Sequence, residues 1–550
     1  MIYLDIETNL THDKIWCVVT KKVSDDGISV NVWIDHVRQE LKDYLEGEQV
    51  CAHNLIGFDA KVLREVWDIS IPLNKAVDTL IMSRLYDPNI EGGHSLKAWG
   101  KRLGFDKMDF DTEDFDRGLT DQMLKYCKRD VDVLERLHNH LVREMGDGWE
   151  QSLALEHEVA MHMARQERTG FKLDVPKASQ LLAELRNRMV DIEMQLQRVF
   201  PPIVTERWSE KTGKRLKDHV EEFNVGSRQQ IAKRLESLGV KFTERTEKGS
   251  IIVNEKTLEG IDLPEAKLIN EYLMLQKRVG LVDAWLERAD ADGRVHGRVI
   301  SNGAVTGRMT HQNPNLGQVP SVNSPYGKEC RSCWTVDDGN VLVGTDLSGI
   351  ELRCLAHYMQ DDNYTKDLLD GDIHTVNQHA AGLETRAQAK TFIYALLYGA
   401  GAAKIGTIAG GNAKKGQELI DKFMGNTPKL QQLLLKVQRI ASKGYVPALD
   451  GRKIRIRSEH AALNSLLQSC GAVIAKQWCI EAHRMLRRKN IPVKQVAFVH
   501  DEIQMETPAE YGDIVADIMT KASLKAGKTL GFRVPVESEA KIGKTWLDTH

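Results

Sequence analysis

The stretch Val341–Arg353 has the sequence Val-Leu-Val-Gly-Thr-Asp-Leu-Ser-Gly-Ile-Glu-Leu-Arg. Its first half is a short apolar run, which predicts a buried strand that ends near Asp346. Residues 347–357 are expected to begin a helix that carries Glu351 and Arg353. The stretch therefore predicts that a carboxylate is delivered at the tip of a buried strand.

A second apolar run lies far downstream, at Val496–Glu506. Its alternation of apolar and polar residues predicts a hairpin with His500 and Asp501 at the bend. Asp346 and Asp501 would then lie on neighbouring strand tips. Carboxylates suit Mg²⁺, and two such ions about 3.5–4 Å apart can clamp the attacking and leaving oxygens of a phosphoryl transfer. Either aspartate alone would be an ordinary turn residue, so the assignment depends on the residues between them.

The length of 550 residues predicts two or more domains. The hydrophobic fraction of 42% and the charged fraction of 28% are those of a soluble globular protein. The sequence contains no apolar run that could span a bilayer and no signal peptide, so a cytoplasmic protein without a membrane partner is expected. Cys330 and Cys333 form a lone Cys-x-x-Cys pair and are expected to be structural, because a zinc site needs four ligands.

Charge is distributed unevenly along the chain. The net charge of −3 argues weakly against a nucleic-acid binder. However, residues 386–457 contain 14 basic and 3 acidic residues, whereas residues 1–145 contain 19 basic and 27 acidic residues. This asymmetry predicts one segment for a polyanion and another suited to cations, although two solvated faces of unlike charge would give the same counts.

The first residues, Met1–Thr8, alternate strictly, so Asp5 and Glu7 share one face of a predicted first and central strand. Exposed acidic residues are poor choices for such a strand, which points to a function for them. Asp59 is a third acidic residue, and it follows an expected apolar turn at Val50–Ala52.

A helix is predicted from Thr120, its N-cap, to about Glu144. Tyr126 and Asp130 lie four residues apart and therefore on one face of this helix.

Three motifs occur in order: Asp5-x-Glu7, Asn54-x-x-x-Phe58-Asp59 and Tyr126-x-x-x-Asp130. Together they resemble the motifs of the DEDD-type 3′→5′ exonucleases. The resemblance implies that Tyr126 orients an attacking water. It also implies that two divalent metals are held by four carboxylates: Asp5, Glu7, Asp59 and Asp130. Asp78 and His94 are expected to be structural or supporting.

The middle of the chain, about 146–300, is expected to be mostly helical. Apolar residues from Leu182 to Val199 recur at steps of three and four, and a second helix at Leu263–Arg288 could pack antiparallel against the first. Residues 200–249 are expected to form a loop followed by a small helix at Ser227–Leu238. The pair would form either a lever that holds a duplex or a plain helical bundle.

A capping box of Thr385 and Gln388 predicts a helix over Arg386–Gly399. Four residues at intervals of four share one face of it: Arg386, Lys390, Tyr394 and Tyr398. Arg386 and Tyr394 would be about 12 Å apart along the axis, which is the reach of a nucleoside triphosphate. The two cations would bind phosphates while the tyrosines face the sugar and base.

Residues 303–320 are turn-rich, with Arg308 and His311 expected to be exposed to a partner. Residues 450–457 are expected to form a basic strand. Asn464 and Gln468 lie one helical turn apart. These amides and Arg308 could contact the minor-groove acceptors common to all base pairs.

The order of these motifs resembles that of the family A (polymerase I-type) DNA polymerases, most closely the replicative enzymes of short-tailed bacteriophages. The resemblance implies that Asp346 and Asp501 bind two Mg²⁺ ions, with Mn²⁺ possible, and that Glu502 supports the site. It implies nucleotide-binding roles for several residues: Arg386, Lys390 and His374 at the triphosphate, Glu351 as a gate against a ribose 2′-hydroxyl, Tyr394 at the sugar and Tyr398 near the template base. Primer and template would contact Arg308, Asn464, Gln468 and His500.

The implied fold is multidomain, α/β and α+β. A right hand would follow an RNase H-like α/β exonuclease domain at 1–145: thumb about 146–300, fingers about 373–445, and palm about 301–372 and 446–550. The expected partners are primer-template DNA and deoxynucleoside triphosphates, with a phage helicase-primase as a further candidate and the protein acting as a monomer in the host cytoplasm. The stretch matching the thumb insertion of thioredoxin-recruiting phage enzymes, Glu206–Glu222, is short, so no thioredoxin partner is expected.

Two alternatives stay open on the sequence alone. The chain could be a nuclease whose polymerase half only binds DNA, although Asp346, Asp501, Arg386 and Lys390 are all present. It could also be a single-subunit RNA polymerase, against which Glu351 and the exonuclease motifs argue.

Overall fold

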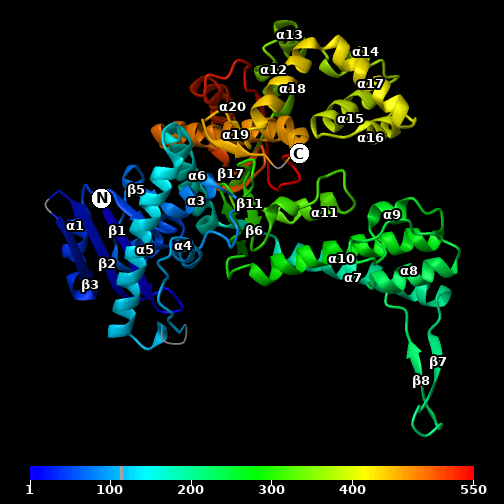
Figure 1. The fold of residues 1–550 in the computed structure, drawn as a ribbon, viewed down its shortest axis with the longest axis horizontal. Coiled ribbons are helices and arrows are strands. Elements are labelled where there is room, and N and C mark those ends of the chain that lie inside the picture. The colour runs from blue at the N-terminus through cyan, green and yellow to red at the C-terminus, as the bar shows by residue number, and fades with distance from the viewer. Residues whose placement is uncertain (26, 112–114, 457) are drawn as a thin grey trace.

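The computed structural model describes residues 1–25, 27–111, 115–456 and 458–550. An N-terminal α/β unit lies beside a larger body, in which a helical arch stands over a central sheet and a pair of long helices extends to one side (Figure 1). None of the described helices is long and apolar enough to cross a membrane.

The N-terminal unit is built on a sheet with the strand order β3-β2-β1-β4-β5. Its strands are β1 (Ile2–Thr8), β2 (Ile15–Ser24), β3 (Gly27–Trp33), β4 (Val50–Ala52) and β5 (Ala76–Asp78). The prediction that the first strand is central is confirmed. The apolar turn expected at 50–52 is wrong, because these three buried residues form β4, which runs parallel to β1.

Helices cover this sheet: α1 (Arg38–Leu45), α2 (Ala60–Trp67), α3 (Thr79–Tyr86), α4 (Leu96–Arg102) and α5 (Asp121–Met145). The predicted start of α5 is confirmed, because the Thr120 hydroxyl accepts a hydrogen bond from the backbone N–H of Met123 at 3.1 Å. Its apolar stripe packs against β1 and β2.

The chain then enters α6 (Glu150–Thr169), β6 (Phe171–Leu173) and α7 (Val175–Val199), and returns along α10 (Pro264–Arg288). The antiparallel packing of α7 and α10 is confirmed: Arg186 contacts Asp283 at 2.7 Å, while Glu193, later in α7, accepts a hydrogen bond from Tyr272, earlier in α10.

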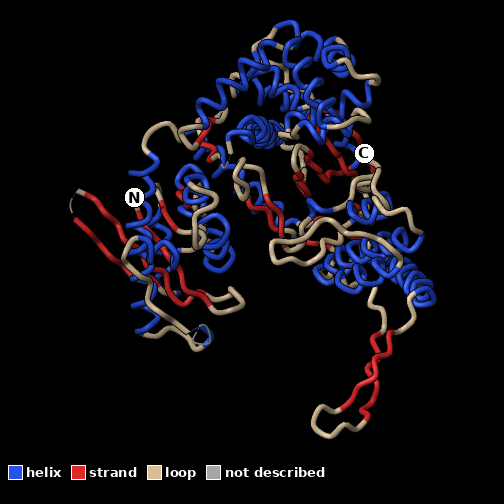
Figure 2. Tube along the Cα trace, turned by 45° about the vertical axis from the view of Figure 1, so that its right-hand side comes forward, coloured by secondary structure: helices blue, strands red, loops and turns tan. Residues whose placement is uncertain are grey.

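The loop expected over 200–249 is partly wrong. It contains an antiparallel hairpin of β7 (Ile203–Trp208) and β8 (Arg215–Glu221), which projects away from the body in both views (Figures 1 and 2). The small helix after it is confirmed as α8 (Arg228–Ser237), capped by Ser227, and α9 (Glu255–Glu259) follows.

The central sheet of the larger body has the order β16-β17-β13-β18. Its antiparallel strands are β13 (Asn340–Leu347), β16 (Lys494–Val499), β17 (Glu502–Pro508) and β18 (Ser538–Gly543). Helix α20 (Gly512–Thr529) packs on the sheet, α19 (Ala462–Arg488) packs against α20, and α12 (Ile350–Met359) packs against α19. The predicted strand ending near Asp346 and the hairpin with its bend at residues 500–501 are confirmed. The helix expected from residue 347 begins later, at Ile350, because β13 extends to Leu347.

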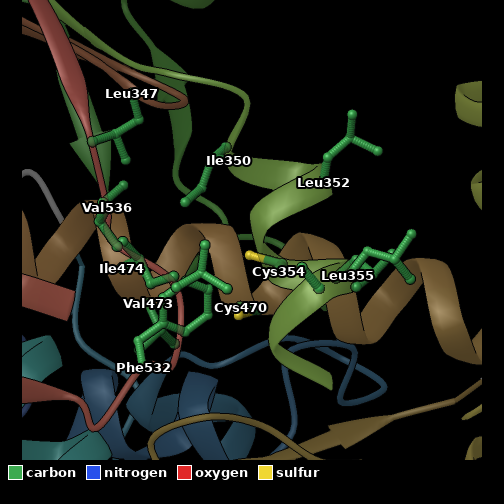
Figure 3. Packing of buried hydrophobic residues seen from close by; sticks show 14 of the residues in the cluster. Leu347, Ile350, Leu352, Cys354, Leu355, Cys470, Val473, Ile474, Phe532 and Val536 are labelled. Atoms are coloured by element: carbon green, nitrogen blue, oxygen red, sulfur yellow. The ribbon is translucent and has the colours of Figure 1, made fainter. Parts of the chain in front are cut away.

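Apolar side chains lock α12 onto α19 behind the tip of β13. Figure 3 shows Ile350 and Cys354 of α12 facing Cys470 and Val473 of α19. All four side chains are almost completely buried. This core fixes where the strand tip ends and where α12 begins.

The helical arch consists of α13 (Asp362–Asp370), α14 (Ile373–Ala381), α15 (Arg386–Leu397), α16 (Ala402–Ile408), α17 (Ala413–Asn426) and α18 (Pro428–Ala441). Smaller elements complete the chain: β9 (Arg294–Val295), β10 (Arg298–Ile300), β11 (Thr310–Gln312), α11 (Gly327–Ser332), β12 (Trp334–Thr335), β14 (Tyr445–Pro447) and β15 (Lys453–Arg455).

The basic strand expected at 450–457 is therefore shorter than predicted. Only β15 is a strand, and Arg452 just before it is buried in ion pairs with Asp450 and Glu156. Arg457 lies outside the described residues.

Candidate active sites

Asp346 and Asp501 come together at the tips of β13 and β17. Asp346 lies opposite Glu502 in the strand register, and the backbone N–H of Leu347 donates a hydrogen bond of 3.0 Å to the carbonyl oxygen of Asp501. His500 adopts a left-handed conformation with φ of 58°, which makes the bend tight. The predicted neighbouring carboxylates are thus brought together by a strand register and a bend.

Negative charge accumulates at these tips. Burial raises the pKa of Asp346 to about 7, and the charges of Asp501 and Glu502 add to the effect. Burial also raises the pKa of Asp501. Carboxylates that resist ionisation in this way are stabilised by a divalent cation, so the residues present fit a metal site.

Glu502 faces the C-terminal residues. Its Oε1 atom accepts hydrogen bonds from the Trp546 indole at 2.5 Å and from His550 at 3.1 Å. These partners and Arg331 lower the pKa of Glu502 against the effect of burial, which raises it. Glu502 is therefore held in place beside the two aspartates.

Two predicted site residues, Arg308 and Tyr398, contact the Glu351 carboxylate. Its Oε1 atom accepts hydrogen bonds from Arg308 at 3.2 Å and from the Tyr398 hydroxyl. A small cleft next to them is also lined by His500 and Asp501. Tyr398 is 46% exposed and borders open space.

The expectation that Arg308 and His311 are exposed to a partner is only partly correct. Both side chains are half-buried: Arg308 is held by Glu351, and burial lowers the pKa of His311 to about 4. Packing against the hairpin bend at His500, which the sequence did not reveal, explains the difference.

The predicted capping box of α15 is confirmed, with Thr385 and Gln388 bonded reciprocally. At the start of this helix, the exposed Arg386 pairs with Asp372 at 2.5 Å. Asp372 in turn caps α14 next to His374.

The remaining nucleotide-site candidates lie on α14 and α15. The ring centroids of His374 and Tyr394 are 6.4 Å apart. Burial lowers the pKa of His374, and the positive charges of Arg386 and Lys390 lower it further. The two cations therefore lie close to this imidazole, on the same side of the helical arch.

Asn464 and Gln468 lie in the first turns of α19, as predicted. The Gln468 amide donates a hydrogen bond of 2.9 Å to the Asn464 side-chain oxygen. The two amides are thus pre-oriented toward each other.

A second acidic cluster lies in the N-terminal unit. Asp5 and Glu7 of β1 and Cys127 of α5 place potential ligand atoms within 4.8 Å of one another. Asp59 ends the π-helical turn Leu55–Asp59 and is buried, and Asp130 of α5 is buried as well. A cleft of about 530 Å³ opens between Asp5 and Asp130.

Negative charge accumulates in this cluster as well. Burial and the charge of Asp130 raise the pKa of Asp5 to about 7, and burial and Asp5 raise that of Glu7 to about 10. Burial and Asp5 likewise raise the pKa of Asp59. The Asp130 Oδ1 atom is buried and has no hydrogen-bond partner among the described residues. Four such carboxylates fit divalent cations.

Sequence reasoning missed two members of this cluster. Lys107 forms an ion pair with Asp130, and its ammonium lies 4.8 Å from the centroid of the Tyr126 ring. The Cys127 thiol lies 3.4 Å from an Asp5 carboxylate oxygen. Lys107 lies in an irregular segment between α4 and α5 and belongs to none of the three motifs. Cys127 matched the apolar stripe of its helix, which gave no signal of a polar role.

Asp78 and His94 play the supporting roles expected of them. Asp78 accepts hydrogen bonds from the backbone N–H groups of Asn54 at 3.1 Å and Ile56 at 3.0 Å, and so holds the turn that ends at Asp59. His94 bonds to the Ser83 hydroxyl at 2.8 Å and lines the cleft.

Residues 204–548 match the model of DNA polymerase family A. The chain belongs to this family. The DNA-directed DNA polymerase of Escherichia phage T7 is 33% identical over the full length of both chains, and that of Enterobacteria phage T3 is 33% identical over 94% of each. DNA polymerase I of Aquifex aeolicus is 27% identical over 99% of this chain and 96% of its own.

A solved structure shares the fold of this family A polymerase. The POL domain of Pol1 from M. smegmatis, in a complex with DNA primer-template and dNTP, superposes with a TM-score of 0.82 at 19% identity, covering 100% of this chain and 95% of that chain. The expected right-hand fold class is therefore confirmed. The protein is a DNA-directed, metal-dependent DNA polymerase, which decides against the two alternatives left open by the sequence.

Proposed function

We propose that this family A polymerase extends a DNA primer at two Mg²⁺ ions and that its N-terminal unit removes mispaired 3′ ends. The observation that carries the proposal is the presence of two separate clusters of acidic side chains with raised pKa values. Family membership supports the first activity, and the three exonuclease motifs support the second.

Mg²⁺ is the proposed metal because the donors are carboxylate oxygens, and Mn²⁺ could replace it. Asp346 and Asp501 would hold the ions for synthesis. Four carboxylates would hold those for the exonuclease: Asp5, Glu7, Asp59 and Asp130. When bound, the ions would polarise the phosphate oxygens and make the attacking hydroxyl or water more acidic.

Arg386, Lys390 and His374 would bind the triphosphate of the incoming nucleotide. Arg386 must exchange Asp372 for a phosphate group, and an exposed ion pair of this kind contributes little to stability. Breaking the ion pair therefore costs little free energy, and a bidentate contact between Arg386 and phosphate more than compensates for that cost. Tyr394 would then face the sugar.

Arg308, Asn464, Gln468 and His500 would contact the primer and template, and Tyr398 would lie near the template base. Glu351 would exclude a ribose 2′-hydroxyl. Arg308 and Tyr398 both donate hydrogen bonds to Glu351. The position of the Glu351 carboxylate would therefore depend both on the primer end at Arg308 and on the nucleotide site at Tyr398.

For the exonuclease, Tyr126 would orient the water that attacks the phosphodiester. Lys107 lies beside both Tyr126 and Asp130. In this position its ammonium would partly neutralise the carboxylates before a metal binds and could contact a substrate phosphate afterwards.

The proposed division of the chain is an exonuclease at 1–145, a thumb at about 146–300, fingers at about 373–445, and a palm from the rest. The proposed setting is phage DNA replication in the cytoplasm of an infected host, by a monomer that could meet a helicase-primase. The short thumb stretch at 206–222 favours independence from thioredoxin. Product lengths on a long primed template should therefore not change when thioredoxin is added.

Primer extension tests the proposal directly. A labelled primer on a template should grow with deoxynucleotides and Mg²⁺, stop growing with EDTA, and grow poorly with ribonucleotides. With nucleotides omitted, a mispaired 3′ end should be shortened. Ribonucleotide extension at an equal rate, or a mispaired end that persists with Mg²⁺ present, would refute the corresponding half of the proposal.

A further inference from the structure

A cavity of about 390 Å³ lies where the N-terminal unit meets the larger body. Its walls come from α2 on one side and from α6 and the end of α19 on the other. Five cationic side chains line it: Lys61, Arg64, Arg165, Arg168 and Arg487. The catalytic proposals above use none of them.

Acidic groups offset the charge of these cations only in part: Glu158 lies near Arg165, and Glu65 and Glu167 lie near Arg168. The acidic residue among the described lining residues is Glu158, and its carboxylate is already paired with Arg484 at 2.8 Å. Arg64 forms a longer ion pair with Glu65 at 3.6 Å. Burial lowers the pKa of Arg165, and the nearby charges of Arg487 and Arg64 lower it further, whereas the charge of Glu158 raises it. The arginines therefore repel one another across the space.

A buried polar group also belongs to the wall. His162 is 3% exposed, and its Nδ1 atom has no hydrogen-bond partner among the described residues. Its ring stacks on His483 with a centroid distance of 4.0 Å. An unpaired buried polar atom is costly, so a ligand that accepts a hydrogen bond here would relieve that cost.

We propose that this cavity binds a phosphate group, carried either by a single DNA strand or by a nucleotide. Guanidinium groups match phosphate oxygens in bidentate geometry, and several of them around one space favour a polyanion over a chloride ion. Binding would remove the repulsion among the arginines and join α2 to α6 and α19.

The position of the cavity offers a path by which either a DNA strand or a nucleotide could reach it. It shares Ile56 and Lys61 with a neighbouring cleft, which shares Ile56 and Gly57 with the next. That cleft shares Asn54 and Arg84 with the cleft at Asp5 and Asp130. A strand entering the acidic cluster, or a nucleotide leaving it, could reach the cavity. This route rests on the proposed exonuclease function, whereas the phosphate site itself does not.

A dye placed in the cavity can report on binding there without interference from the polymerase site. All eight native cysteines are buried, so Ser70→Cys on the cavity rim gives one exposed thiol for an environment-sensitive fluorophore. The labelled full chain is titrated, in EDTA, with inorganic phosphate, thymidine monophosphate and an oligothymidylate of about ten nucleotides.

We expect a saturable signal that weakens with added salt. The pair Arg165→Ala with Arg487→Ala should weaken binding about tenfold or more, whereas Arg488→Ala, on an exposed neighbour that does not line the cavity, should not. Arg64→Gln on the opposite wall provides a second test if the double variant misfolds by circular dichroism.

The three probes separate the two sources. An oligonucleotide that binds about tenfold more tightly than the monophosphate identifies a strand site, and equal affinities identify a nucleotide site. The proposal is overturned if no probe saturates the signal up to about 10 mM, or if the arginine variants bind as tightly as the parent protein. If the parent protein binds phosphate but has no exonuclease activity, only the route to the acidic cluster is refuted.

Discussion

The ammonium group of Lys476 donates a hydrogen bond of 2.6 Å to the carbonyl oxygen of Gly307, the residue just before Arg308. Lys476 is 1% exposed, and Glu156 accepts a hydrogen bond from it at 2.5 Å and forms an ion pair with Arg452 at 2.7 Å. Gly307 has φ of +75°, and a Cβ atom there would lie 2.5 Å from Arg452. Buried ions from α6 and α19 thus fix the backbone that presents Arg308 to Glu351.

Replacing Lys476 with Met should strongly destabilise the protein. The change leaves Glu156 buried with one cation fewer, and breaking a buried ion pair costs about 3–5 kcal/mol. Urea unfolding of the purified variant would measure the loss. Lys521→Met is the matched control, because it breaks a helical ion pair of 2.7 Å that is exposed and worth about 0.5 kcal/mol. Similar losses in both variants would contradict the assigned role.

The two acidic clusters should be separable by mutation. Asp346→Asn removes a carboxylate from the strand tips and should reduce primer extension by about a thousandfold or more while leaving shortening of a mispaired primer intact. Asp5→Ala with Glu7→Ala should do the reverse. Rates of both reactions would be measured on the same labelled primer. If either variant lost both activities while keeping its circular dichroism spectrum, two independent sites would be ruled out.

Local patterns in the sequence were enough to predict much of the fold. The strand ending at Asp346, the bend at Asp501 and the capping box before Arg386 each depend on a few adjacent residues, and each is confirmed. The central position of β1 followed from one alternating stretch. The resemblance to a known family then supplied the proposed roles of individual residues, which sequence spacing cannot give.

What the sequence could not predict depends on contacts between distant residues. Arg452 belongs to a basic run and was expected to be in a strand, but it is buried because Glu156 approaches it from a helix nearly 300 positions earlier. The strand β4 has only three residues, so its pairing with β1 decides its structure. Lys107 approaches Asp130 from a segment without periodicity.

Acid should weaken the junction between α6 and α19. Burial lowers the pKa of His483 to about 4, and burial together with His483 lowers that of the stacked His162. Below about pH 6.5 these two imidazoles bind protons in the unfolded chain but stay neutral in the folded protein. The free energy of unfolding should therefore fall as the pH drops from about 6.5 toward 4.

The slope would be about 1.4 kcal/mol per pH unit for each imidazole, and His483→Gln should remove one such contribution. Urea unfolding at several pH values between about 7 and 5 would measure it, with the parent protein compared at each pH. A variant that kept the full slope would show that this imidazole is already protonated in the folded protein.

Glu351→Ala should relax discrimination against ribonucleotides. Arg308 and the Tyr398 hydroxyl hold the Glu351 carboxylate in one position, and a fixed carboxylate can exclude a 2′-hydroxyl that a methyl group would admit. The ratio of kcat/KM for a deoxynucleotide to that for the matching ribonucleotide should fall about tenfold or more. Tyr398→Phe, which removes one of the two donors, should cause a smaller fall. Glu384→Ala changes an exposed acidic residue just before α15 and should leave the ratio unchanged. An unchanged ratio in Glu351→Ala would mean that another side chain closes the sugar site.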